Sequence, residues 1–268
     1  MIISEKELPE SSKLAEVQQE RAASFAEGQG EDHPPAYDDH IHDTSVLAGS
    51  STTPVNMVAP PEVKPTNFFS LIQRDSSIKG TYVIDPHLQL PTSLLLPLQA
   101  GETEEERKNL YLHTRDGYID ADVWLVGRKA NEKSPLNKKR TTLSVSSNDG
   151  SVTAKVHSID IIDPFFLDIF ARDGRVTVLL PRSFHGPLNL KARHHGHALS
   201  DGLLRSSTSL GTADHTSRYF VGDFSAASGQ QWKGDELRVE TRDGKIKVRY
   251  IDEIEISKGG FFSRIFSM

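Results

Sequence analysis

Apolar and polar residues alternate along most of the chain after residue 66, which is the pattern of a β-strand with one buried face. One segment reads Leu110-Tyr-Leu112-His-Thr114, then Arg-Asp-Gly-Tyr, then Ile119-Asp-Ala121-Asp-Val123. The alternation has a period of two on both sides of the Asp-Gly pair. This pattern predicts two strands, each with one buried face, joined by a short turn.

The same unit returns along the chain, so it is an internal repeat and sets the architecture. An early copy has Asp75-Ser76 at the turn, and a degraded copy begins at Leu188 and loses the pattern at His194 and His195. The long gap before the last copy indicates a further decayed copy around residues 219–224. The clear copies have an Asp-Gly pair at the turn: Asp116-Gly117, Asp149-Gly150, Asp173-Gly174 and Asp243-Gly244.

An Asp-Gly pair between two alternating runs is a strong hairpin signal, because both residues readily adopt positive φ. In a two-residue hairpin Thr114 faces Ile119 and Leu110 faces Val123, which makes one side of the hairpin apolar. One hairpin cannot bury that side alone, so the units must stack. We therefore predict a mainly β fold of stacked β-repeat units, either a solenoid-like coil or an elongated β-sandwich. The only helix signal after residue 66 is at residues 103–107.

Composition changes the picture at the N-terminus. Residues 1–65 hold twelve acidic and four basic residues, seven of the fourteen prolines and only two aromatic residues. Such a segment has too little apolar surface to offset its chain entropy. We expect a disordered acidic arm over residues 1–65, a β-repeat domain over residues 66–256 and an apolar tail over residues 257–268.

Three stretches resemble an uncharacterised domain family of filamentous and mushroom-forming fungi. They are residues 77–86, residues 107–112 with 117–121, and Leu180-Pro-Arg-Ser-Phe184. The likeness covers residues 66–256, and the repeat is also similar to that of bacterial adhesin domains with a β-solenoid. The resemblance implies a β architecture and brings no activity, since the fungal family has no assigned function.

The arm contains one partner motif, Pro34-Pro35-Ala36-Tyr37. It matches the Pro-Pro-x-Tyr ligand of WW domains, in which a preformed polyproline II segment docks in an aromatic-lined groove. An accessible arm is the setting that such recognition requires. Pro34, Pro35 and Tyr37 are therefore the predicted partner-binding residues, and a WW-domain protein is the predicted partner.

No residues are singled out for catalysis or for a cofactor. The chain has no cysteine, no Gly-rich phosphate loop, no Gly-x-Ser-x-Gly elbow and no His-Glu-x-x-His. The turn aspartates are explained by turn chemistry and by neighbouring arginines better than by calcium. The histidines at 40 and 42 and at 194, 195 and 197 do not predict a dedicated metal site, and a near-neutral folded part predicts no nucleic-acid surface.

The segment 127–140 is basic and is interpreted as a solvated insertion between strands. In the tail, Phe261, Phe262, Ile265 and Phe266 are predicted to cover the open end of the β stack rather than to contact a membrane. The N-terminus shows no signal-peptide pattern and no apolar stretch is long enough to span a bilayer, so we expect a cytoplasmic protein.

These observations favour a non-catalytic interaction or scaffold module whose arm recruits a WW-domain protein. The alternative is a carbohydrate-active or adhesin-like β-solenoid protein, which rests on the repeat architecture. A deep groove lined by carboxylates and aromatic residues favours the alternative. The sequence does not give the ligand of the β-repeat domain or the oligomeric state.

Overall fold

The computed structural model describes residues 59–98, 102–128, 140–223, 225 and 232–253. The strands follow in the order β1 (Phe69–Gln73), β2 (Ile78–Ile84), β3 (Leu110–Thr114), β4 (Ile119–Val126), β5 (Thr141–Ser147), β6 (Val152–Ile159), β7 (Phe165–Ala171), β8 (Val176–Leu180), β9 (Gly186–Ala192), β10 (His197–Leu199), β11 (Ser207–Ala213), β12 (Thr216–Val221), β13 (Glu236–Thr241) and β14 (Ile246–Tyr250). A 3-10 turn, η1 (Thr92–Leu94), and one short helix, α1 (Asp201–Arg205), complete the elements of the described residues. The predicted mainly β fold is confirmed.

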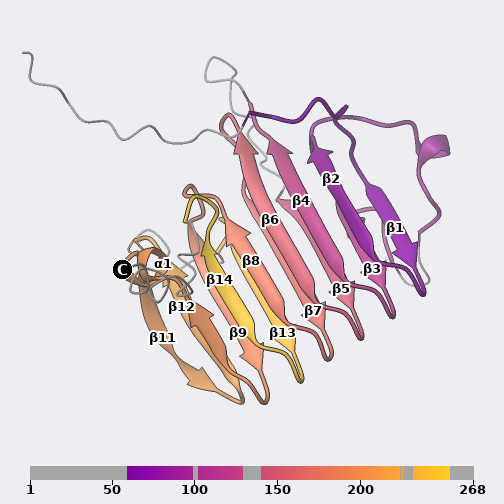
Figure 1. The fold of residues 1–268 in the computed structure, drawn as a ribbon. Helices are drawn as coiled ribbons and strands as arrows, with labels where there is room; N and C mark the ends of the chain where they lie inside the picture. The colour runs from indigo at the N-terminus through magenta and orange to yellow at the C-terminus, as the bar shows by residue number, and fades with distance from the viewer. Residues whose placement is uncertain (1–58, 99–101, 129–139, 224, 226–231, 254–268) are drawn as a thin grey trace, which may run out of the picture. The chain divides into compact units, whose positions relative to one another are not determined.

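The strands form two sheets that face each other across an apolar core (Figure 1). The eight-stranded sheet has the order β1-β3-β5-β7-β13-β9-β12-β11, and the six-stranded sheet has the order β10-β14-β8-β6-β4-β2. Each repeat unit, which we call a coil, places one strand in each sheet. Neighbouring coils pair in parallel, so Leu110 of β3 lies beside Leu143 of β5. This is the solenoid alternative of the two architectures that the sequence left open.

Alternation decides which side chains fill the core. Leu110, Leu112 and Thr114 of β3 are buried, as are Ile119 and Ala121 of β4, while the residues between them face outward. A fully buried aliphatic side chain contributes on the order of 1.5–3 kcal/mol before ordering costs. The inward positions predicted from the pattern are therefore the ones that hold the coils together.

The predicted hairpins are wrong. The two strands of a coil lie in different sheets and do not pair with each other, because β3 pairs with β1 and β5 while β4 pairs with β2 and β6. The Asp-Gly turn is an arc that carries the chain from one sheet to the other. Alternation specifies which side chains are buried and leaves the pairing partner open, so it fitted the arc as well as the hairpin.

The turn glycines are also used differently from the prediction. Positive φ among described glycines occurs at Gly186, Gly196, Gly211 and Gly222, and at none of the four Asp-Gly turns. A Cβ on Gly150 would instead collide with the backbone carbonyl of Gly117, and a Cβ on Gly174 with that of Gly150. Glycine is required at these stacked positions because successive arcs pack too closely to leave room for a side chain.

Buried hydroxyl groups tie these arcs together. The Ser147 hydroxyl donates to the Gly117 carbonyl (2.7 Å) and accepts from the Gly150 N–H (3.0 Å). Thr241 repeats the arrangement, donating to Gly174 and accepting from Gly244. Each such hydroxyl satisfies two buried backbone groups of neighbouring coils, which explains a polar residue at an inward position.

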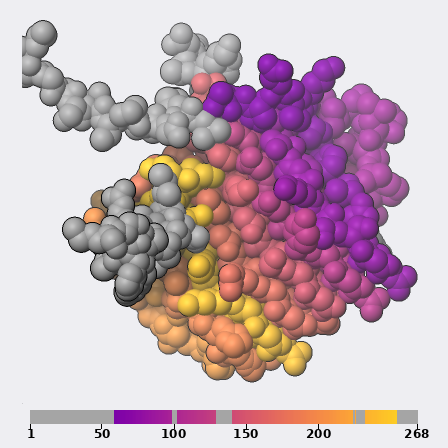
Figure 2. Space-filling model, in the orientation of Figure 1, coloured from indigo at the N-terminus to yellow at the C-terminus, as the bar shows by residue number. Residues whose placement is uncertain are grey.

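The coils do not stack in chain order. The last coil, β13 and β14, lies between the coil of β7 and β8 and the coil of β9 and β10. β13 pairs in parallel with both β7 and β9, and β14 pairs with both β8 and β10. In Figure 2 the yellow atoms of this coil lie between salmon and orange atoms of segments that precede it in the sequence.

Two further expectations are corrected. The decayed copy expected at residues 219–224 is not a coil, because β12 pairs antiparallel with both β9 and β11. Residues 103–107 contain a turn rather than a helix, although the Glu106 carboxylate accepts from the backbone N–H and the hydroxyl of Thr103 (3.1 Å each). One turn of helix without a packed face is too short to persist. In the described ranges no helix is long and apolar enough to cross a membrane.

Candidate functional site

The outward face of the eight-stranded sheet carries side chains in register from strand to strand. In one row Asp168 of β7 lies beside Arg238 of β13, Arg238 beside Asn189 of β9, and Asn189 beside Arg218 of β12. Adjacent strands are about 4.8 Å apart. Residues far apart in the sequence thus form one polar row, because β13 is inserted between β7 and β9.

Part of this row lines a groove of about 380 Å³ on β9, β12 and β13, which we call the arginine groove. Its Lys191 pairs with Glu240 (2.8 Å), and Arg238 approaches Glu236 outside the groove (3.8 Å). Arg218 is exposed and makes no ion pair with a described residue. The lining residues are Asn189, Lys191, Thr216, Arg218, Arg238, Val239 and Glu240.

The arginine groove is positively charged. Lys191, Arg218 and Arg238 supply three positive charges against the single carboxylate of Glu240, an excess of two. Glu236 offsets little of this excess, because its carboxylate also accepts from Arg140 (3.0 Å). Guanidinium groups present a planar fork of N–H donors, which suits carboxylate and phosphate groups.

Asp168 lies at the β7 end of the row. Its pKa is raised because the carboxyl is desolvated by burial, while Arg238 and Lys108 act in the opposite direction. Phe166, one outward position before Asp168, lies under the guanidinium of Arg238, 5.3 Å from the ring centroid. The aromatic ring holds the Arg238 guanidinium on the β7 side of β13.

A second groove of about 420 Å³ lies where the chain enters β7 and β13 and where it leaves β8, and we call it the tryptophan groove. The ring of Trp232 contacts the rings of His185 (5.5 Å between centroids) and Phe220 (5.0 Å). The residues that line the tryptophan groove are Asp160, Ile161, Ile162, Pro164, Ser183, His185, Trp232, Gly234 and Asp235.

Asp235 is the most buried carboxyl of the tryptophan groove. It accepts hydrogen bonds from the backbone N–H of Phe165 (3.0 Å) and of His185 (2.9 Å). Burial raises its pKa, and these two hydrogen bonds oppose the rise. Since both oxygens are used by backbone groups, Asp235 joins three chain segments and is not presented to a ligand.

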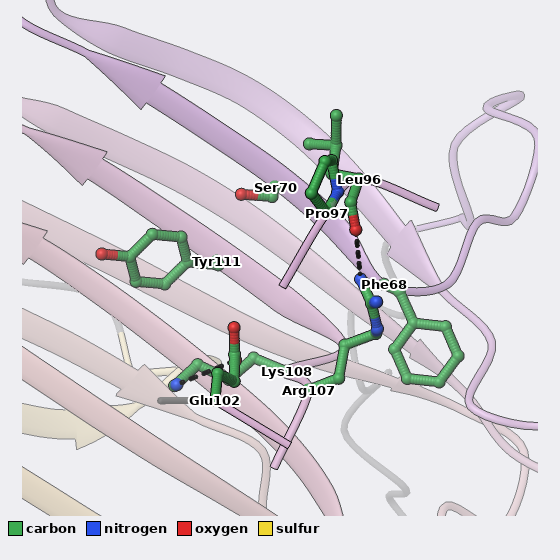
Figure 3. Close-up of a pocket in the computed structure, with 8 residues that line it drawn as sticks. All are labelled: Phe68, Ser70, Leu96, Pro97, Glu102, Arg107, Lys108 and Tyr111. Atoms are coloured by element: carbon green, nitrogen blue, oxygen red, sulfur yellow. Dashed lines mark hydrogen bonds and ion pairs between the residues drawn. The ribbon is translucent and has the colours of Figure 1, made fainter. Parts of the chain in front are cut away.

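A third, smaller cleft lies beside the edge strand β1 (Figure 3). Its volume is about 50 Å³, enough for water and too small for a larger ligand. Arg107 donates to the Leu96 carbonyl (2.7 Å) and forms a two-point ion pair with Glu104. The cleft is thus a product of the segment that folds back over β1.

The predicted turn residues lie on the arcs. Asp116, Asp149, Asp173 and Asp243 follow one another along the edge of the stack, each directly before its glycine. Arg172 donates to both Asp173 and Asp149, and its hydrogen bond holds the pKa of Asp173 below the usual value. These exposed ion pairs contribute little each, because solvent screens them.

The remaining sequence candidates do not converge. His194 pairs with Asp243 (3.6 Å), whereas His197 bonds to the Tyr219 hydroxyl (2.8 Å). Across residues 59–253, as far as they are described, no three His, Asp or Glu side chains are grouped to hold a metal ion. Outside the described residues lie Pro34, Pro35, Tyr37, the histidines at 40 and 42, residues 129–139 and the tail residues Phe261, Phe262, Ile265 and Phe266.

Sequence reasoning missed the arginine groove. Alternation marks Arg238, Asn189 and Arg218 as outward residues, and that signal was available. Their convergence depends on β13 lying between β7 and β9, and no local pattern indicates that order. The tryptophan groove was missed because its residues come from irregular connections.

The chain belongs to the family described as "Domain of unknown function (DUF7330)", whose model matches residues 67–253. The match spans the stacked coils and both larger grooves. Comparison with the curated proteins and with the solved structures gave no match.

Proposed function

We propose that this chain is a non-catalytic interaction module. In this proposal the outward face of the eight-stranded sheet binds a ligand, and the N-terminal arm recruits a WW-domain protein. The observation that carries the proposal is the arginine groove, where Arg238, Asn189 and Arg218 present donors in register on three adjacent strands. Side chains on paired strands are held at fixed spacing, which suits recognition.

The arm supplies the second binding element. Pro34 and Pro35 favour a polyproline II conformation, so little conformational entropy is lost when the segment docks. Tyr37 then fills a pocket beside the aromatic groove of a WW domain. Linking two binding elements in one chain raises the effective concentration of one partner near the other.

The test of the arm is capture by isolated WW domains. We expect the full chain and a peptide of residues 32–43 to bind, and Tyr37→Ala to abolish binding. Tyr118→Ala is a matched control, since Tyr118 is an exposed tyrosine (48%) on the β stack. A peptide that binds no WW domain of a broad panel at high micromolar concentration removes the WW partner from the proposal.

A carbohydrate-binding, adhesin-like role is the second candidate, and the tryptophan groove favours it. Trp232 and His185 lie there with the exposed carboxyl group of Asp160. The chain has two tryptophans, and the other, Trp124, is buried (4%). Oligosaccharide that enters the groove should therefore quench Trp232 fluorescence, and the quenching should persist in Trp124→Phe. An unchanged spectrum across a set of neutral and acidic oligosaccharides counts against this role.

A further inference from the structure

We propose that the arginine groove is a binding site for a small molecule that carries a phosphate monoester. Arg218 and Arg238 lie two strands apart, on either side of Asn189. Two strand spacings place their backbones roughly 10 Å apart. The Arg238 guanidinium lies over Phe166 of β7, and a turn of this long side chain toward β9 brings it to an anionic group that Arg218 reaches from β12, above Asn189.

The charge of the groove matches a dianion. Lys191 is neutralised by Glu240, whereas Arg238 is only 3.8 Å from a Glu236 carboxylate that also pairs with Arg140, and Arg218 has no ion pair with a described residue. The two guanidinium groups therefore supply the positive charge for the ligand. A phosphate monoester carries between one and a half and two negative charges at neutral pH, with a second pKa of about 6. Its three acceptor oxygens accommodate two guanidinium forks and the amide of Asn189.

The size of the groove indicates more than a free anion. Its volume of about 380 Å³ falls at the lower end of the range for small-molecule sites, which is roughly 300–1,000 Å³. The Thr216 hydroxyl and the Glu240 carboxylate line the same space and are suited to hydroxyl groups next to the phosphate. A phosphorylated polyol is therefore the ligand class that fits.

The site depends on the inserted coil. β13 brings Arg238, while β9 and β12 bring Asn189 and Arg218. Phe166 of β7 lies beneath the Arg238 guanidinium, on the other side of β13 from Asn189. The groove thus forms where β13 joins β7 to the paired strands β9 and β12.

The experiment is calorimetric titration of the full chain with glucose 6-phosphate, glucose and inorganic phosphate at fixed ionic strength. We expect glucose 6-phosphate to bind with a dissociation constant of ~1 mM or tighter, inorganic phosphate to bind more weakly, and glucose not to bind. Affinity should fall as the pH is lowered through about 6, where the phosphate loses one charge. Inorganic phosphate that binds as tightly as the ester would overturn the small-molecule assignment.

Variants identify the groove. Arg218→Ala should weaken binding of glucose 6-phosphate at least tenfold, about 1.4 kcal/mol. Arg238→Lys, which keeps the charge and loses the fork, should weaken it several-fold. Arg74→Ala is the matched control, because Arg74 is an exposed arginine at the end of β1, at the opposite edge of the same sheet.

Arg218 is exposed, so Arg218→Ala is expected to melt as the parent does and to carry the test if a change at Arg238 disturbs folding. Equal binding by Arg218→Ala and Arg74→Ala, or no saturable binding by the parent, would sink the proposal. Tyr37→Ala should leave phosphate binding unchanged, which separates this site from the WW interaction of the arm.

Discussion

At the scale of single residues, the turn glycines show that a residue repeated at one position can be required for a reason other than backbone conformation. Gly150 has no positive φ, and its place is set by the carbonyl of Gly117 in the preceding arc. Gly196 has the opposite situation, with φ of 67° and open space around it. Asparagine tolerates positive φ and still has a Cβ, so the same substitution distinguishes the two causes.

We therefore expect Gly150→Asn to lower the free energy of unfolding by about 1–3 kcal/mol, because the arcs must separate. Gly196→Asn should change it by less than about 0.5 kcal/mol. Urea denaturation of both variants measures the difference. Equal effects in the two variants would show that close approach between arcs is not the constraint at Gly150.

A second prediction at this scale concerns His157 on β6. Burial lowers its pKa below the ordinary 6.5, and the nearby Asp122 carboxylate (2.7 Å) opposes the shift. Because the unfolded chain binds the proton more readily, stability is complete above pH 6.5 and is lost as the pH falls below it. His197 shifts in the same direction, also through burial.

We expect the free energy of unfolding to decrease between pH 7.5 and 5.5, and to decrease less in His157→Gln. Urea denaturation at several pH values gives both curves. Parallel curves for the parent and His157→Gln would contradict a role of His157 in this pH dependence.

At the scale of elements, the order of the coils is the main consequence of the fold. The strands of the C-terminal coil have a neighbour on each side, whereas β1, β2, β10 and β11 lie at sheet edges. β9 and β12 reach the rest of the eight-stranded sheet only through β13. The coils before residue 181 are paired to one another without it.

Deletion of residues 232–268 should therefore leave β1 to β8 paired and release β9 to β12. We expect a smaller dependence of the unfolding free energy on urea than in the parent, since less surface is buried. Deletion of residues 254–268 is the control, because it keeps every described strand. If both deletions unfold with the same urea dependence, the central position of the last coil is wrong.

The same elements show what the sequence predicts and what it leaves open. Alternation identified the strands on both sides of Gly117, Gly150, Gly174 and Gly244 and their buried faces, because burial repeats with the period of the strand. It did not identify pairing partners, since Leu110 packs inward equally well in a hairpin or an arc. The order of the coils, and with it the arginine groove, depends on contacts between residues such as Arg238 and Asn189 that no local pattern encodes.

At the scale of the whole molecule, the two proposed binding elements belong to separate parts of the chain. The contacts within the chain divide it into residues 1–53 and residues 54–268. The hydrogen bonds of the β stack begin at Thr66. The Thr66 N–H donates to the Val83 carbonyl, and the Thr66 carbonyl accepts from the backbone N–H of Asp85. Asn67 and Asn109 continue this support, joined by a buried hydrogen bond of 2.7 Å.

Deletion of residues 1–53 should therefore remove WW binding and leave the melting temperature unchanged within a few degrees, because both sheets and their apolar core are built from residues 69–250. Binding of glucose 6-phosphate should also persist, since Arg218, Arg238 and Asn189 all lie in the coils. Thermal unfolding and calorimetry on the full and shortened chains test both statements.

A shortened chain that melts at a markedly lower temperature, or that binds the phosphate ester at least tenfold more tightly, would mean that the arm interacts with the β stack. Tighter binding of the ester by the shortened chain would show that the acidic arm and the ester compete, so that recruitment by the arm and binding by the sheet are coupled rather than independent.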